Sequence, residues 1–234
     1  MISTNLLLPI LWIFSFAFSP EEAKPIEKVI TENPISLFEQ LSEKTEALPK
    51  KEVFDIALKG WQKLNSELKS KVITIIDFSL PSTEKRLWII DPTNQLVLLN
   101  TVVSHGRNSG NLMASKFSNK PESYQSSLGF YKTAETYQGK HGYSLRLDGL
   151  EQGFNDQARN RAIVIHGADY AREEFAKNTG RLGRSLGCPA LPTEISSKAI
   201  DFIKDGSLLF IYGQDENYLK SSSLIRSLEQ LSAP

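Results

Sequence analysis

The pattern of apolar residues along the chain changes from helical to strand-like near residue 70. In residues 36–48 and again in residues 51–68, apolar side chains recur every three or four positions, and Pro49 separates the two runs. Such a stripe lies on one side of a helix, and helices of this kind normally cover a sheet. Residues 20–70 are therefore expected to form a polar linker followed by a helical N-terminal segment.

From residue 72 onward, the apolar runs are short and rich in β-branched and aromatic residues, which is typical of strands. The turn-forming residues 91–94 (Asp-Pro-Thr-Asn) join two of these runs and predict a β-hairpin. Helices are expected to begin at Asp169 and Thr193 and to end before Gly180 and Gly206. The predicted strands cover residues 72–78, 86–90, 95–103, 127–134, 143–147, 162–166 and 207–212.

These elements predict a mainly β or α+β fold, with a mixed, largely antiparallel and sandwich-like β core surrounded by peripheral helices. We assign residues 71–213 to this core domain. Residues 214–234 are expected to form a polar C-terminal helix, from about residue 216 to 231, that packs on the outside. At 234 residues, the chain has room for one such domain and a smaller appendage.

The charge of the chain excludes a general attraction to polyanions. Lysine plus arginine and aspartate plus glutamate number 27 each, so nothing draws the whole molecule to nucleic acid or anionic lipid. We expect no nucleic-acid partner, and the sequence identifies no specific protein partner.

The first 19 residues carry no charged side chain, and residues 6–18 form an almost unbroken apolar run. A membrane span needs about 20 apolar residues, whereas the apolar part of a secretory signal is about 7 to 15 residues long. We therefore predict that residues 1–19 are a signal peptide and that the protein is exported to the periplasm or cell envelope. The alternatives are an N-terminal membrane anchor and a buried helix, because no basic residue precedes the run.

The single cysteine, Cys188, lies between Gly187 and Pro189, in a sequence that suits a tight turn. One cysteine cannot form an internal disulfide, and exported proteins that use cysteine for structure normally have an even number. The alternative is a small buried apolar side chain, since free cysteine is often buried. We interpret Cys188 as a candidate nucleophile.

An apolar run that ends at His166, 22 residues before Cys188, supplies a candidate base. A free thiol is only slightly ionised at neutral pH, and an adjacent imidazole raises its thiolate fraction. The alternative is a histidine with a purely structural place at the end of a strand. The spacing alone does not decide between these two readings.

The residues around the cysteine offer further polar groups. The amides of Gly187 and Cys188 suit an oxyanion hole, because a glycine-containing turn can direct N–H groups at a developing negative charge. Ser185, Arg181 and Arg184 are candidates to hold a carboxylate or to orient the loop. For the arginines, the alternative is a solvated surface charge.

These residues resemble the His…Ser-x-Gly-Cys signature of the L,D-transpeptidases with a YkuD-type catalytic domain. His166-Gly167 is followed by Ser185-Leu186-Gly187-Cys188, and residues 183–192 (Gly-Arg-Ser-Leu-Gly-Cys-Pro-Ala-Leu-Pro) are similar to a divergent branch of murein L,D-transpeptidase catalytic domain proteins. Similar blocks occur in the same order in residues 103–107, 126–131 and 139–142.

The resemblance implies acyl transfer on peptidoglycan stem peptides, with no cofactor and no metal. Cys188 is implied to attack the third stem residue and form a thioester, while His166 transfers the protons. A second stem then completes a crosslink, or water releases a trimmed stem. The common family motif has an arginine soon after the cysteine, where this chain has residues 189–192 (Pro-Ala-Leu-Pro). The expected substrate-binding residues are Arg184, His105, Gly167 and Ser127. His105 and Ser127 lie in loops that are expected to line the cleft.

Three other readings remain open. The three histidines and the cysteine could form a His3Cys zinc site, although no closely spaced ligand pair supports it. Papain-like and NlpC/P60-like hydrolases place cysteine before histidine, the reverse of the order here. The third reading is a peptidoglycan-binding protein that keeps the fold and has lost turnover.

Overall fold

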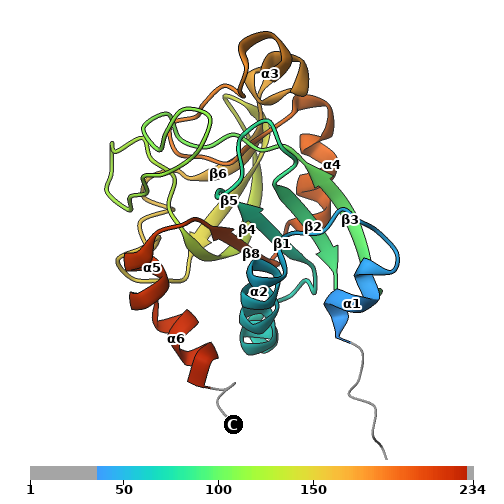
Figure 1. Cartoon of the computed structure of the whole chain (residues 1–234). Coiled ribbons are helices and arrows are strands. Elements are labelled where there is room, and N and C mark those ends of the chain that lie inside the picture. The colour runs from blue at the N-terminus through green and yellow to red at the C-terminus, as the bar shows by residue number, and fades with distance from the viewer. Residues whose placement is uncertain (1–35, 231–234) are drawn as a thin grey trace, which may run out of the picture. The chain divides into compact units, whose positions relative to one another are not determined.

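Eight strands in the described part of the chain form one mixed sheet, in the order β3-β2-β1-β8-β4-β5-β6-β7 (Figure 1). Neighbouring strands are antiparallel except for the pairs β1–β8 and β6–β7, which are parallel. The expected fold class, a mixed and largely antiparallel β core with peripheral helices, is confirmed. The strands are β1 (Ile73–Asp77), β2 (Leu87–Asp91), β3 (Leu96–Thr101), β4 (Gly129–Gly139), β5 (Gly142–Gly149), β6 (Val164–Gly167), β7 (Ala190–Leu191) and β8 (Leu208–Tyr212).

The computed structural model describes residues 36–230, which belong to one compact unit. The predicted signal peptide over residues 1–19 and the predicted linker over residues 21–34 lie outside the described residues. Among the described helices, none combines the length and the apolar character that a membrane crossing needs.

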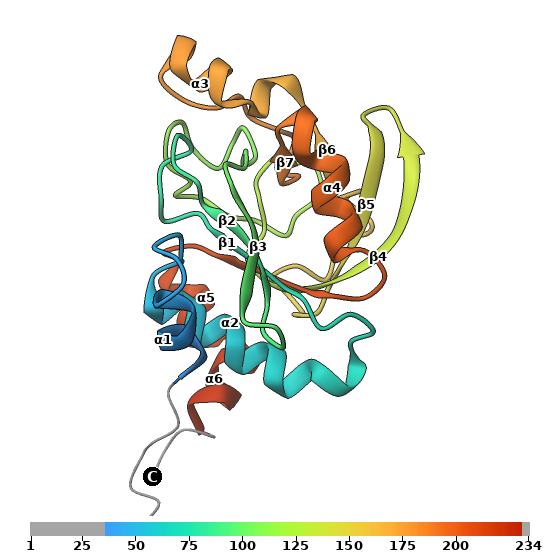
Figure 2. The same ribbon diagram turned by 90° about the vertical axis from the view of Figure 1, so that its right-hand side faces the viewer.

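The sheet curves around helix α4 (Thr193–Ile203), which contacts β5 and β6 and also reaches β2, which three intervening strands separate from β5. Helix α2 (Lys51–Leu64) instead packs on β1 and β8, and Figure 2 shows α4 and α2 on different sides of the strands. Side chains of strand β4 show which helix covers each face of the sheet. The hydroxyl of Thr133 donates to the carbonyl of Ile203 at the end of α4, 2.6 Å away, whereas the neighbouring Phe130 faces α2.

Close contact between α2 and the sheet depends on a glycine in the helix. A Cβ atom at Gly60 would lie 2.3 Å from Cε1 of Phe130, so only glycine lets this ring approach the helix backbone. Phe130 in turn stacks on Phe210 of β8, with ring centroids 4.4 Å apart. Buried aromatic pairs of this kind contribute about 1 kcal/mol beyond the burial of their area.

The N-terminal helices pack on the same core as the sheet. Helix α1 (Leu37–Ser42) begins with a capping box in which Ser36 and Glu39 bind each other's backbone amides, and it is shorter than expected. Helix α2 is followed by the short 3-10 helix η1 (Asn65–Glu67), so the predicted helix over residues 51–68 is confirmed.

Two predicted helices are divided in the structure. The segment after Ala168 forms the 3-10 helix η2 (Asp169–Ala171) and then α3 (Glu173–Thr179), which ends at Gly180 with φ of 77° as expected. The C-terminal segment forms α5 (Glu216–Ser221) and α6 (Ser223–Gln230) rather than one helix. The break falls at Ser222, whose hydroxyl donates to the buried carboxylate of Glu151.

Candidate active site

The sulfur of Cys188 is bound to the main chain at the start of β6. The backbone N–H of Val164 donates to Sγ over 3.5 Å, and the thiol donates to the carbonyl of Ala162 over 3.6 Å. The parallel register that pairs His166 with Ala190 places Cys188 beside Val164. Two residues along a strand span roughly 7 Å. The fold therefore places the predicted nucleophile, Cys188, beside the short strand β6, which carries the predicted base, His166.

The imidazole of His166 is fixed in one tautomer by its neighbour. Its Nδ1 atom lies 2.9 Å from the carbonyl oxygen of Gly167. A carbonyl can only accept a hydrogen bond, so Nδ1 carries the proton and Nε2 presents a free lone pair. Burial lowers the pKa of His166, which keeps the ring neutral at neutral pH. These two effects prepare Nε2 to accept a proton.

The thiol of Cys188 is protonated in the resting site. Burial raises its pKa, and the three groups that oppose this effect are the N–H of Val164, the charge of Arg161 and the cysteine's own amide. The hydrogen bond to Ala162 also requires the thiol form, since a carbonyl accepts. Ionisation of Cys188 therefore needs a base, and His166 is the base that the fold places on the adjoining strand.

Ser185 shapes the turn that carries the nucleophile. Its hydroxyl donates to the carbonyl of Cys188 over 2.6 Å and accepts from the amide of Gly187 over 3.0 Å. Its backbone is also held, because its amide donates to the carbonyl of His105. Ser185 thus acts on the backbone of the turn, and these bonds leave its side chain no free donor for substrate.

The expectation that the Gly187 amide is an oxyanion donor is wrong for this conformation, because that amide is buried and already donates to Ser185. What the site requires of Gly187 is its backbone shape, with φ of 126°. A Cβ there would also lie 2.9 Å from the carbonyl oxygen of Gln125. The amide of Cys188, which lies against its own sulfur, remains a candidate oxyanion donor.

Two of the expected substrate-binding residues instead organise neighbouring backbone. The guanidinium of Arg184 donates to the carbonyls of Gly110 and Arg107, at 3.0 and 3.3 Å, and so ties the nucleophile turn to the loop after β3. Gly167 lets α4 approach β6, since a Cβ there would lie 2.5 Å from the hydroxyl of Ser196. A direct contact of Arg184 or Gly167 with substrate stays a prediction.

His105 is fully buried, so its expected place on the surface of the cleft is wrong. Its Nδ1 atom lies 2.8 Å from a guanidinium nitrogen of the equally buried Arg86. Burial and this nearby charge lower the pKa of His105 to about 4, which keeps the ring neutral near pH 7. The backbone carbonyl of His105 accepts a hydrogen bond from the amide of Ser185, and this bond holds the turn in place.

Ser127 is buried against a residue that the sequence did not single out as functional. Its hydroxyl accepts a hydrogen bond from Arg161 and donates to the carbonyl of Ser118 over 3.0 Å. Arg161 also donates to the carbonyls of Ser118 and Gln125, at 2.7 and 2.6 Å. Both residues therefore connect the loop before β4 to the start of β6.

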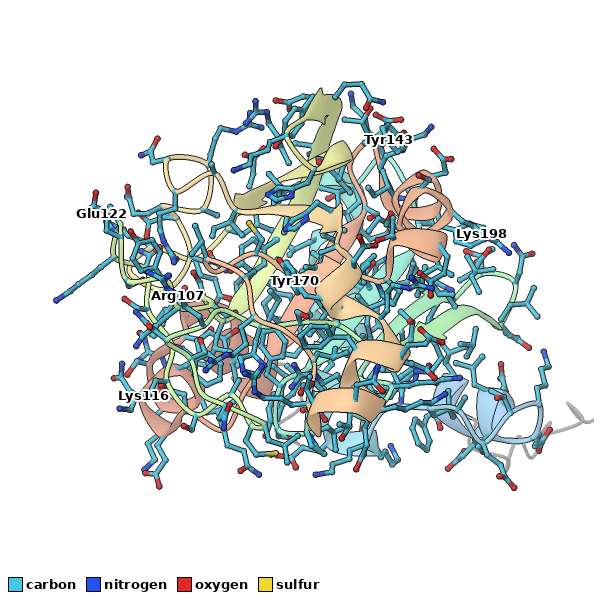
Figure 3. The ribbon with its side chains drawn as sticks, turned by 90° about the horizontal axis from the view of Figure 1, so that it is seen from above. Arg107, Lys116, Glu122, Tyr143, Tyr170 and Lys198 are labelled. Atoms are coloured by element: carbon cyan, nitrogen blue, oxygen red, sulfur yellow. The ribbon has the colours of Figure 1, made fainter. Side chains whose placement is uncertain are left out.

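Two further aromatic side chains lie near the candidate pair: His141, whose glycine-rich loop was a possible wall of the cleft, and Tyr170, which the sequence did not single out. His141, exposed in the turn between β4 and β5, stacks on His166. Tyr170, in η2, lies near enough to Cys188 to be affected by it, and burial followed by this neighbour raises the Tyr170 pKa to about 12. Figure 3 shows Tyr170 at the centre of this side of the molecule, between Arg107 and Lys198.

The His3Cys zinc site does not form in this structure. His141 and His166 are stacked, but His105 lies in the interior against Arg86. Across residues 36–230, no three histidine, cysteine, aspartate or glutamate side chains gather as a metal site would require. These four side chains therefore do not meet as one ligand set.

Sequence comparison identifies one family. Residues 45–212 match the family described as "L,D-transpeptidase catalytic domain", and this match covers well over half of the chain. No curated protein sequence matches the chain.

Solved structures that resemble the chain include three L,D-transpeptidases. The one from Mycobacterium smegmatis is 13% identical, with 62% of this chain and 59% of that chain covered and a TM-score of 0.38. The one from Stackebrandtia nassauensis is 17% identical, with 69% and 66% covered and a TM-score of 0.38. The one from Mycobacterium tuberculosis H37Rv is 14% identical, with 61% and 58% covered and a TM-score of 0.34. The chain thus spans less than two thirds of the length of these proteins.

Proposed function

Because the chain belongs to the family of L,D-transpeptidase catalytic domains, we propose that it transfers acyl groups on peptidoglycan stem peptides through a thioester on Cys188. The observation that carries this proposal is the placement of the Cys188 sulfur against the main chain at the start of β6, the strand that carries His166. The free Nε2 lone pair of His166 supports it, because a neutral imidazole can take the thiol proton.

In the acylation step, Nε2 of His166 removes the proton from the Cys188 thiol as the sulfur attacks the carbonyl carbon of the third stem residue. The amide of Cys188 is the proposed donor to the developing oxyanion. The C–N bond to the terminal D-alanine then breaks. The leaving amine takes the proton from the imidazolium, so that D-alanine departs neutral at nitrogen and the stem remains bound as a thioester.

In the second step, an amine of another stem attacks the thioester carbonyl and gives its proton to His166. The C–S bond breaks, and the sulfur leaves as a thiolate that recovers the proton from the imidazolium. Water in place of the amine gives a trimmed stem instead of a crosslink. Neither route needs an oxidant, a metal or a cofactor.

Export to the cell envelope is part of the proposal, because peptidoglycan lies outside the cytoplasm. The support is the uncharged, apolar N-terminal sequence, which lies outside the described residues. Fractionation of cells that produce the tagged full chain tests it. The tag should be found in the envelope or periplasmic fraction, and its retention in the cytoplasmic fraction would contradict export.

The reaction itself is tested by incubating the purified protein with muropeptides that carry a tetrapeptide stem and separating the products by chromatography. We expect release of D-alanine together with either a crosslinked dimer or a tripeptide product. If the protein binds the muropeptides but releases no D-alanine, the result would favour the alternative of an inactive peptidoglycan-binding protein. The Cys188→Ala variant serves as the control for release by contaminating enzymes.

A further inference from the structure

The guanidinium of Arg161 lies against the turn that carries the nucleophile. A Cβ atom at Gly187 would come within 3.3 Å of Nη2 of Arg161, which places the charge beside the residue that precedes Cys188. The same nitrogen donates to the carbonyl of Gln125 over 2.6 Å, and Nη1 donates to the carbonyl of Ser118 over 2.7 Å. The side chain is thus fixed from several directions.

The backbone that follows Arg161 holds the sulfur of Cys188. Ala162 has φ of 52°, the left-handed region that a residue with a Cβ rarely adopts, at a cost of roughly 1–2 kcal/mol. In this conformation its carbonyl accepts the thiol, and the amide of Val164 binds the same sulfur. A single segment of four residues therefore presents an acceptor and a donor to the sulfur of Cys188 and a cation beside the preceding Gly187.

The other charged and titratable groups around Cys188 do not supply a comparable cation. His166 on β6 is neutral near pH 7, and Tyr170 on η2 is uncharged at that pH because its pKa is raised to about 12. Arg184, on the turn itself, directs its hydrogen bonds at the carbonyls of Arg107 and Gly110. Arg161 and Cys188, in contrast, each favour the charged form of the other.

We propose that Arg161 is a positioning residue of this site, which holds the Gly187–Cys188 turn against the start of β6 and provides the fixed positive charge that stabilises the Cys188 thiolate. A guanidinium suits this task because its planar fork keeps its hydrogen bonds in one geometry and its charge persists over the working pH range. The inference rests on the proposed thiol chemistry but concerns the ionisation of the sulfur, which can be measured without any peptidoglycan substrate.

The test is the pH dependence of the rate at which iodoacetamide alkylates the folded protein. Cys188 is the single cysteine of the chain, so the rate reports its thiolate alone. The matched control is Arg159→Gln, two residues earlier in the same segment, because Arg159 pairs with Asp148 and Glu135 at 2.5 and 2.8 Å. Circular dichroism and thermal unfolding establish that each variant is folded.

We expect Arg161→Gln to move the midpoint of alkylation upward by about one pH unit, which lowers the rate at pH 7 by about tenfold. Arg161→Lys should give an intermediate midpoint, because it keeps the charge and loses the fork, while Arg159→Gln should match the wild type. A merely structural role would lower thermal stability and leave the midpoint unchanged, and this result overturns the proposal.

If Arg161→Gln does not fold, the comparison of Arg161→Lys with Arg159→Gln decides, since equal midpoints again overturn the proposal. Failure of the acyl-transfer proposal is recognised separately. In that case the alkylation midpoints still shift as expected, whereas no stem peptide is ever bound to Cys188.

Discussion

The imidazole of His141 stacks on that of His166, with ring centroids 4.3 Å apart and ring planes inclined by 25°. His141 is exposed in the turn between β4 and β5, whereas His166 is buried, so the outer ring covers the inner one. Burial and then the nearness of His141 lower the pKa of His166. The turn between β4 and β5 therefore helps to keep the candidate base neutral.

We expect His141→Ala to raise the pKa of His166, because the change uncovers the ring and removes an imidazole whose charged form opposes protonation of His166. The acid limb of the pH dependence of kcat/KM should then move to higher pH by about half a unit. His141→Phe keeps a stacked ring without a charge and should move the limb less. NMR titration of the His166 ring gives the same comparison without substrate, and an unchanged pKa in His141→Ala would contradict the covering role.

Ser185→Ala should destabilise the fold through the turn that carries the nucleophile. The change leaves the buried amide of Gly187 without its acceptor and the carbonyl of Cys188 without its donor, which costs about 1–3 kcal/mol. Urea unfolding measures this loss. Ser197→Ala, on the exposed side of α4, is the matched control and should change the free energy of unfolding by less than about 0.5 kcal/mol.

Gly187→Ala and Gly153→Ala separate backbone strain from steric conflict. Both glycines have a positive φ, 126° and 83°, so both substitutions carry a backbone cost of about 1 kcal/mol or more. A Cβ at Gly153 meets nothing within 4 Å, but one at Gly187 would lie 2.9 Å from the carbonyl oxygen of Gln125. We expect Gly187→Ala to lose at least twice as much stability and to slow alkylation of Cys188. Equal losses would contradict a tightly packed turn.

The buried His105 predicts a loss of stability in mild acid. Its pKa falls from 6.5 to about 4 on folding, so the unfolded chain binds more protons between these pH values. The resulting loss of stability is absent above about pH 6.5, grows as the pH falls, and reaches about 3 kcal/mol by pH 4. Urea unfolding at pH 7.5 and pH 4.5 should show this loss in the wild type and much less of it in His105→Asn. The same slope in both proteins would rule out His105 as its source.

Much of the fold can be predicted from local sequence, because most elements have a clear apolar period and a recognisable boundary. The hairpin of β2 and β3 forms around Asp91, whose carboxylate accepts from the amides of Thr93 and Asn94. The exceptions depend on distant residues. The break between α5 and α6 needs Glu151, 71 positions from Ser222, and β7 is two residues long, too short to show any period.

The candidate site likewise contains some residues that local sequence reveals and others that depend on distant parts of the chain. Cys188 and His166 are recognisable because each has a distinctive local setting, a glycine–proline turn and the end of an apolar strand. Arg161 is not, since its place beside Gly187 arises from the left-handed backbone of Ala162 and from loop carbonyls that no sequence pattern reveals. The sequence likewise offers no sign that Ser185 takes up the Gly187 amide.

The most direct test of the proposed chemistry is intact-protein mass spectrometry after brief incubation with a tetrapeptide-containing muropeptide, followed by peptide mapping. Wild-type protein should gain the mass of the donor less its terminal alanine, on Cys188, and the adduct should be released by hydroxylamine as a thioester is. Cys188→Ala should show no adduct and release no D-alanine. Release of D-alanine by Cys188→Ala at the wild-type rate, or an adduct mapped to another residue, would contradict the role of Cys188 as the nucleophile.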